Sequence, residues 1–237
     1  YDQINFQSFI DVSLMNEISK NVDGYRLSAF MYKDKDSEDG RLTMGPIWDY
    51  NLAFGNADYY QGSNPTGWQI EYDPEGAIPF WWQRIWDDEA FTTAFALRWQ
   101  GLRQTIFSND HIMNKIDSVT AVLDEAQVRN FQRWPILNQY VWPNAYVGGS
   151  YQNEIDYLTG WISDRLNWID LQTVNIYTSG DVNIDGIVNV LDVVQIVQYI
   201  LEYVEFTSTQ EQLADINQDG ELNVVDIVLI VNIILGY

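Results

Sequence analysis

The chain has 237 residues, 46% of them hydrophobic, which is enough for one large domain or for two smaller domains with packed cores. Its 34 acidic and 12 basic residues give a formal net charge of −22, which argues against nucleic acid and anionic lipid as partners. No apolar run reaches the roughly 18 residues that a membrane span needs, and the absence of cysteine excludes disulfides and thiolate metal sites.

Charge is distributed unevenly along the chain. Residues 1–179 hold 24 acidic and 12 basic residues, whereas the last 58 residues, from Gly180 onward, hold ten acidic residues and no lysine or arginine. Ten like charges in a compact segment repel one another unless cations neutralise them. The pattern therefore predicts a first domain over 1–172, a linker over 173–179 and a small second domain over 180–237.

The first domain is predicted to be mostly helical. Residues 5–20 place apolar side chains at helical spacing, namely Phe6, Phe9, Ile10, Leu14 and Ile18. Helical patterns recur over 80–86, 91–99, 109–134 and 149–171, the last with an inner face of Ile155, Leu158, Ile162, Leu166 and Ile169. Residues 25–33 and 41–48 instead read as the strands of a hairpin, joined by the charged turn D-K-D-S-E-D-G. The expected fold class is mostly α with a small β hairpin.

Two short motifs flank this hairpin, K-N-V-D-G-Y-R over 20–26 and G-P-I-W-D-Y-N-L-A-F-G over 45–55. The two ends of a hairpin are neighbours in space, so Asp23 and Asp49 can face one cleft with Asn51 beside them. Two carboxylates and a carboxamide can hold Mg²⁺ and its nucleotide phosphates. The structural alternative is that Asp23 caps a turn and that Asp49 accepts hydrogen bonds from backbone amides.

The run F-I-D-V-S-L-M-N-E-I-S-K-N-V-D-G-Y-R-L-S-A-F-M-Y-K, followed by L-T-M-G-P-I-W-D-Y-N-L-A-F-G-N, resembles the CotH (spore-coat protein H) kinase family. The resemblance is strong over 5–60 and weaker, but continuous, to about residue 170. It implies a kinase-like C-terminal lobe of α+β type and phosphate transfer from ATP. It also implies that Asp23 corresponds to the catalytic-loop acid, which orients or deprotonates the acceptor hydroxyl. Asp49 corresponds to the metal-binding acid of the kinase D-F-G motif, with Asn51 as its helper.

A kinase also needs an N-terminal lobe that covers the phosphates and supplies a lysine to them. Only 22 residues precede Asp23, and they are predicted to form one helix. The chain contains no G-x-G-x-x-G motif and no P-loop. We therefore expect a C-terminal fragment of a longer protein, inefficient as a kinase by itself, with Mg²⁺ and ATP as cofactors of the parent protein.

Two other interpretations of the first domain stay open. One is a non-catalytic binding or structural protein that uses the kinase-like fold as a surface. The other is an accessory protein that binds polysaccharide on some of its ten tryptophans, including Trp81, Trp82 and Trp86, although aromatic residues at helical spacing more often form a core. The single histidine, His111, has no obvious partner in the sequence and is assigned no role.

The second domain is an internal repeat with an offset of 34 residues. The stretch D-V-N-I-D-G-I-V-N-V-L-D over 181–192 aligns with D-I-N-Q-D-G-E-L-N-V-V-D over 215–226, and the apolar residues that follow align as well. Each copy predicts a polar loop followed by an apolar helix. An aspartate stands in the first turn of each helix, where a negative charge suits the helix dipole.

Both loops have the ligand spacing of a calcium site. Such loops use side-chain oxygens at positions 1, 3 and 5, a backbone carbonyl at 7, a water-holding group at 9 and a carboxylate at 12, with glycine at 6. The glycines are Gly186 and Gly220, and the predicted ligands are Asp181, Asn183, Asp185, Ile187, Asn189 and Asp192, then Asp215, Asn217, Asp219, Glu221, Asn223 and Asp226. Unrelated Asx turns are the alternative, but two copies in register favour two Ca²⁺ ions.

Tandem loops of this kind, each followed by one helix and with no helix before it, resemble dockerin domains. The resemblance implies a small all-α domain that calcium folds, and it implies binding to a cohesin module on a scaffold or cell-surface protein. It places the partner-facing residues at loop positions 10 and 11, here the apolar Val190 and Leu191, then Val224 and Val225. A secreted, extracellular protein attached to a scaffold or cell surface is therefore expected.

Overall fold

A computed structural model describes residues 2–173, 179–185, 187–217 and 219–236. The chain divides into two compact units, a first unit of residues 1–95 with 105–172 and a second unit of residues 96–104 with 173–237. Of the predicted linker over 173–179, residues 174–178 lie outside the described residues, as does Gly186 of the first loop. None of the described helices is long and apolar enough to cross a membrane.

The first unit begins with helix α1 (Phe6–Ser19), which is capped at both ends. The side chain of Asn5 accepts a hydrogen bond from the backbone N–H of Ser8 at 3.2 Å. At the other end Lys20 has a left-handed φ of 46°, and its N–H donates to the carbonyls of Asn16 and Glu17. One face of α1 is buried, including Phe9, Ile10, Leu14 and Ile18, as the helical spacing predicted.

The hairpin consists of β1 (Met31–Lys33) and β2 (Leu42–Met44), antiparallel with Met31 opposite Met44. It is shorter than predicted because residues 23–28 form a turn, in which the carbonyl of Asp23 accepts three backbone N–H groups. The connection contains the short helix α2 (Asp36–Asp39). The predicted fold class, mostly α with a small β hairpin, is confirmed.

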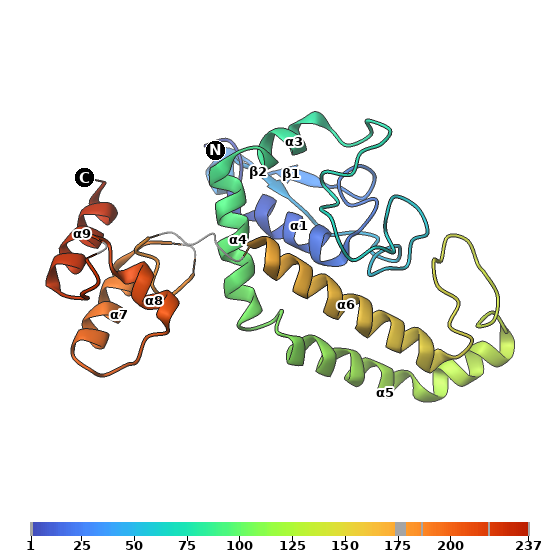
Figure 1. Cartoon of the computed structure of the whole chain (residues 1–237). Coiled ribbons are helices and arrows are strands. Elements are labelled where there is room, and N and C mark those ends of the chain that lie inside the picture. Colours follow the sequence, from blue (N-terminus) through green and yellow to red (C-terminus); the bar gives the residue numbers. More distant parts are fainter. Residues whose placement is uncertain (1, 174–178, 186, 218, 237) are drawn as a thin grey trace. The chain divides into compact units, whose positions relative to one another are not determined.

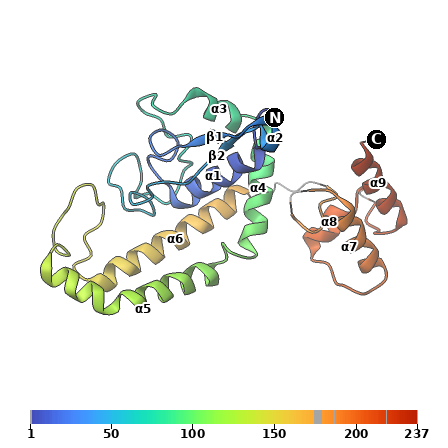
Figure 2. The ribbon, with the colours of Figure 1, turned by 180° about the vertical axis from the view of Figure 1, so that it is seen from behind.

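Four helices complete this part of the chain: α3 (Phe80–Trp86), α4 (Glu89–Arg103), α5 (Asn109–Arg133) and α6 (Tyr151–Thr173). Helices α5 and α6 run side by side (Figure 1, Figure 2). They begin and end within two residues of the predicted limits. Helix α6 buries Ile162, Leu166 and Ile169, whereas α5 has no buried residue along its 25 positions.

Aromatic rings fill the core of the first unit. Trp82 is fully buried, and its ring centroid lies 4.9 Å from that of Tyr25, 6.0 Å from that of Phe9 and 4.4 Å from that of Trp81. Trp86 is buried as well. The tryptophan run of α3 is therefore mainly a core element, as its helical spacing favoured.

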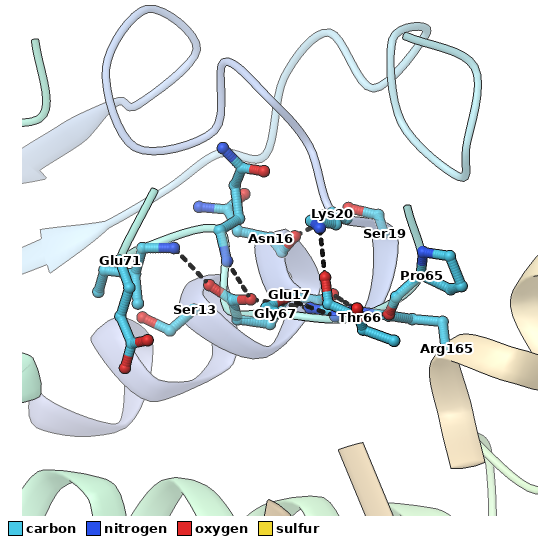
Figure 3. A network of polar contacts seen from close by, with 12 residues as sticks. Ser13, Asn16, Glu17, Ser19, Lys20, Pro65, Thr66, Gly67, Glu71 and Arg165 are labelled. Atoms are coloured by element: carbon cyan, nitrogen blue, oxygen red, sulfur yellow. Dashed lines mark hydrogen bonds and ion pairs between the residues drawn. The ribbon is translucent and has the colours of Figure 1, made fainter. Parts of the chain in front are cut away.

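A buried ion pair joins α1 to α6 and to the loop over 64–70 (Figure 3). The Nη2 of Arg165 lies 2.9 Å from Oε2 of Glu17, and both side chains are 0% exposed. The Glu17 carboxylate also accepts bonds from the Tyr25 hydroxyl and from the backbone N–H groups of Gln69 and Ile70. Burial raises the pKa of Glu17 while the Arg165 guanidinium opposes the rise, and burial lowers the pKa of Arg165.

The remaining donors of this network hold backbone carbonyls of the same loop. Arg165 donates to the carbonyls of Pro65 and Gly67, and the ammonium of Lys20 donates to those of Asn64 and Thr66. Burial, with a smaller contribution from Arg165, lowers the pKa of Lys20 to about 8. An irregular loop is thus fixed by charged side chains rather than by a sheet.

Besides residues 96–104, the second unit contains α7 (Val190–Ile200), α8 (Ser208–Ala214) and α9 (Val224–Leu235). Helices α7 and α9 begin with the same capping box, Asn189 with Asp192 and Asn223 with Asp226. Helix α8, which precedes the second loop, was not predicted. The core is built from Val182, Ile196, Ala214 and Ile230, and the equivalent positions Val188 and Leu222, then Val193 and Ile227, pack against it. The repeat in the sequence is therefore a repeat in the structure.

We predict that Arg165→Met lowers the free energy of unfolding by about 3–5 kcal/mol, because it leaves the Glu17 carboxylate buried without its counter-charge. Urea unfolding at constant calcium, followed by tryptophan fluorescence, measures this. Nine of the ten tryptophans lie in the first unit, so the signal reports mainly on that unit.

The control is Arg129→Met, which breaks an exposed pair with Glu125 on α5 and should change stability by at most about 0.5 kcal/mol. The double variant Glu17→Leu with Arg165→Met should lose less than the sum of its two single changes. A loss below about 1 kcal/mol for Arg165→Met would show that the pair is not a structural requirement.

Candidate functional site

Asp23 lies in the turn that follows α1. Its carboxylate pairs with the Nη2 of Arg26 at 3.0 Å, and its side chain is 18% exposed. The guanidinium carbon of Arg26 lies 3.9 Å from the centroid of the Tyr60 ring, so the arginine is held between an anion and an aromatic face. Asp23 is therefore a fixed carboxylate with partial access to solvent.

Asp49 and Asn51 lie on the exposed segment that leaves the hairpin. Asp49 has a left-handed φ of 63°, which is uncommon for a residue other than glycine, and such positions often occur at functional sites. The residue between them, Tyr50, points inward, and its hydroxyl donates to Oδ1 of Asn16 at 2.6 Å. Burial raises the pKa of Tyr50 to about 12, so the hydroxyl remains a donor at all physiological pH values.

The buried Asn16 connects the two motifs. Its Oδ1 accepts the Tyr50 hydroxyl, and its Nδ2 donates to the carbonyl of Gly24 at 3.0 Å. Gly24 follows Asp23 and Tyr50 follows Asp49, so one carboxamide contacts the residue next to each candidate carboxylate, at Gly24 through the backbone and at Tyr50 through the side chain. The carboxamide and Tyr50 were not singled out in the sequence. Only the hairpin geometry indicated that the two motifs meet.

Aromatic side chains gather on the loops next to Tyr60, the residue whose ring contacts Arg26 of the Asp23 turn. Tyr59 stacks on Trp142 with ring centroids 6.5 Å apart, and the hydroxyl of Tyr140 donates to the carboxylate of Asp58. Trp142 is 73% exposed, so one aromatic surface remains open to solvent. The loops over 56–60 and 140–145 are also joined by a backbone bridge between Ala57 and Asn144.

We predict that Gly24→Ala lowers the free energy of unfolding by about 1–3 kcal/mol, because a Cβ there would lie 2.4 Å from Oδ1 of Asn16. That carboxamide is held by two hydrogen bonds and cannot move away without breaking them. Urea unfolding measures the loss. The matched control is Gly160→Ala in α6, where nothing lies within 4 Å and where alanine should stabilise the helix by about 0.5–1 kcal/mol. Equal stability of the two variants would contradict the close fit at Gly24.

The first predicted calcium loop is folded by its own polar side chains. The N–H of Asp185 donates to Oδ1 of Asp181 at 3.1 Å and to Oδ1 of Asn183 at 2.9 Å. Oδ1 of Asp185 in turn accepts the N–H of Ile187. The carboxylate of Asp192 accepts the N–H groups of Val182, Asn183 and Asn189, so position 12 of the loop is bonded to positions 2, 3 and 9.

The second loop repeats this pattern. The N–H of Asp219 donates to Asp215 and to Asn217, and Oδ1 of Asp219 accepts the N–H of Glu221. The carboxylate of Asp226 accepts the N–H groups of Ile216 and Asn223. The two carbonyls predicted as ligands have equivalent partners as well. The side-chain amide of Asn189 donates to the backbone carbonyl of Ile187 at 3.0 Å. The side-chain amide of Asn223 donates to the backbone carbonyl of Glu221 at 3.1 Å.

Three aspartates of the two loops are buried, and buried carboxylates need cations or hydrogen-bond donors as partners. Asp181 is 1% exposed, and Asp192 and Asp226 are 0% exposed, in a segment from 180 to 237 that contains no lysine or arginine. Buried charges are normally paired or bound to a metal, and each carboxylate keeps lone pairs beyond those that accept N–H groups. Among the described residues no three His, Cys, Asp or Glu side chains form a ready metal cluster. The donor set is nevertheless the oxygen-only set that calcium prefers.

The predicted partner-binding residues lie on the surface of the second unit. Val190 and Leu191 are 64% and 56% exposed, and Val224 and Val225 are 66% and 48% exposed. The apolar surface continues along each helix at equivalent positions, with Val194, Val197 and Leu201 on one and Val228, Val231 and Leu235 on the other. Exposed apolar surface of this extent is typical of protein interfaces.

The fold and the two kinds of site thus define a helical body followed by a tandem-loop unit. Comparison with family models gives the family: the model of the CotH kinase protein matches residues 2–169, and that of the dockerin type I domain matches residues 179–235. The chain belongs to the CotH kinase protein family and carries a dockerin type I domain, as its motifs indicated. Comparisons with curated proteins and with solved structures found no match.

Proposed function

We propose that the chain is a kinase-family body attached to its place of action by a calcium-dependent docking unit. The observation that carries the proposal is the pair of equivalent loops, each closed by a fully buried aspartate and followed by a helix with an exposed apolar face. We assign the body to residues 1–172, the linker to 173–179 and the docking unit to 180–237.

Two calcium ions would be held by the twelve loop residues predicted from the sequence. Dockerin type I domains generally bind Ca²⁺. Calcium would neutralise carboxylates that otherwise repel one another, so part of its binding free energy becomes folding free energy of this unit. The backbone hydrogen bonds to Asp192 and Asp226 already orient both carboxylates toward the loops.

The partner of the docking unit is a cohesin module on a scaffold or cell-surface protein, since dockerin domains bind cohesin modules. The apolar pairs Val190 with Leu191 and Val224 with Val225 would contact it, so the surface that they meet is apolar. Attachment of this kind agrees with an extracellular protein.

For the body we propose a part in phosphoryl transfer, with Asp23 orienting the acceptor hydroxyl and with Asp49 and Asn51 near a magnesium ion. Bound Mg²⁺ and ATP would supply the phosphoryl group and neutralise its charge. The shared contact of both motifs with Asn16 supports this assignment, because one buried carboxamide bonds the Gly24 carbonyl of the first motif and the Tyr50 hydroxyl of the second. The ion pair with Arg26 would hold the Asp23 carboxylate in a fixed orientation.

We predict that isothermal titration of the full chain, freed of metal with chelator, finds two calcium ions per chain. Asp181→Ala or Asp215→Ala should each remove one ion, and the double variant should bind none, because position 1 of each loop supplies a carboxylate ligand. Asp156→Ala on α6, an exposed acid outside both loops, is the control and should retain both ions. Two ions in the double variant would refute the loop assignment.

We predict that the double variant Val190→Asp with Val224→Asp loses binding to an immobilised cohesin module by at least about 100-fold, because both apolar contact surfaces become charged. Surface plasmon resonance in calcium and in chelator measures this. The calcium stoichiometry should stay at two. Val122→Asp on α5, which replaces a valine that is 82% exposed in the body, is the matched control and should bind as the unaltered chain does.

A further inference from the structure

An apolar groove lies in the first unit, and its lining includes none of the candidate residues Asp23, Asp49 and Asn51. It has a volume of about 550 Å³, within the range of small-molecule sites. Its walls come from α1, α5 and α6 and from Phe54, and they include Ile18, Ile112, Ile116, Leu158 and Ile162. These side chains leave a hydrocarbon-lined space between α5 and α6.

The polar groups at this groove are basic. His111 and Lys115, both on α5 and four residues apart, line it with exposed side chains, and no acidic side chain is among the described residues that do. Residues four apart lie on the same face of a helix. The groove is therefore a local basic site in a chain with a net charge of −22.

Lys115 differs from most other basic residues of the chain. Arg26, Lys33, Lys35, Arg41, Arg129 and Arg165 each pair with a carboxylate. In the part of the chain that the structure describes, the ammonium of Lys115 has neither an ion pair nor a hydrogen bond. It is available for an anion.

The apolar walls are also incompletely covered. Helix α5 has no buried residue, and Ile106, which lines the end of the groove, is 50% exposed. Apolar side chains that face a water-filled groove gain stability when a hydrocarbon displaces the water. The groove therefore combines apolar surface that needs cover with an unpaired cation at its edge.

We propose that this groove binds a free single-chain anionic amphiphile of the fatty-acid type. The hydrocarbon tail occupies the space between α5 and α6, and the carboxylate pairs with Lys115 and accepts a hydrogen bond from His111. A free amphiphile fits better than an anionic membrane surface, because the charge of the whole chain repels such a membrane.

The test is isothermal titration of the full chain, at low calcium, with three ten-carbon probes: decanoate, decanol and decyltrimethylammonium. Decanoate should bind one site and do so about tenfold or more tightly than the cationic probe. Lys115→Glu should reverse this order while decanol binding stays the same. Lys35→Glu, the same charge change in the hairpin connection, should behave as the unaltered chain does.

Ile116→Trp, which fills the groove, should abolish binding of all three probes, with circular dichroism showing that the helices remain. Absence of saturable decanoate binding, or equal decanoate affinity in Lys115→Glu and Lys35→Glu, would overturn the proposal. Sedimentation with vesicles of equal parts phosphatidylglycerol and phosphatidylcholine should leave the chain in solution. Sedimentation that Lys115→Glu prevents would assign the groove to a membrane surface instead.

Discussion

The first unit depends on the buried pair of Glu17 and Arg165. Removing two charges from water is costly unless each finds a full set of partners. Here the carboxylate accepts bonds from a tyrosine, an arginine and two backbone amides, while the guanidinium also holds three carbonyls. These bonds fix α1, α6 and the loop over 64–70 in one arrangement. An apolar pair could stabilise the helices, but it would leave the polar groups of the loop without partners.

This constraint explains how a unit with a two-stranded ribbon can position a site on irregular backbone. The segment from the hairpin to α3 has few ladder hydrogen bonds of its own. It is held by side chains from the helices: Lys20 and Arg165 along 64–67, Trp161 on the carbonyl of Ser63 and Tyr157 on that of Gly55. Asn16 performs the same task for the turns that carry Asp23 and Asp49. The rigid part of the site is thus α1, and the candidate carboxylates project from turns tied to it.

Structural features that depend on neighbouring residues could be predicted from the sequence, whereas contacts between residues far apart in the chain could not. The periodicity of α1, α5 and α6, the hairpin and the two equivalent polar loops could be predicted because each depends on residues within about one element length. Glu17 and Arg165 are 148 positions apart, and no pattern in the sequence indicates that they form an ion pair. Asn16 was missed because a polar residue on an amphipathic helix reads as solvent-facing, and its bond with Tyr50 spans 34 positions. Helix α8 was missed because its seven residues carry little apolar periodicity, although Thr207 and Gln210 form a capping box at its start.

The two units also differ in what holds them together. In the second unit the core is small, and equivalent residues of the two copies, such as Ile196 and Ile230, fill it. In the first unit, α1 and α6 are anchored by buried charges and aromatic rings, but α5 contributes no buried side chain over its 25 residues. Little apolar contact opposes the local opening of such a helix. Proteolysis of the native protein, with fragments traced to α5, would therefore report whether an occupied groove protects that helix.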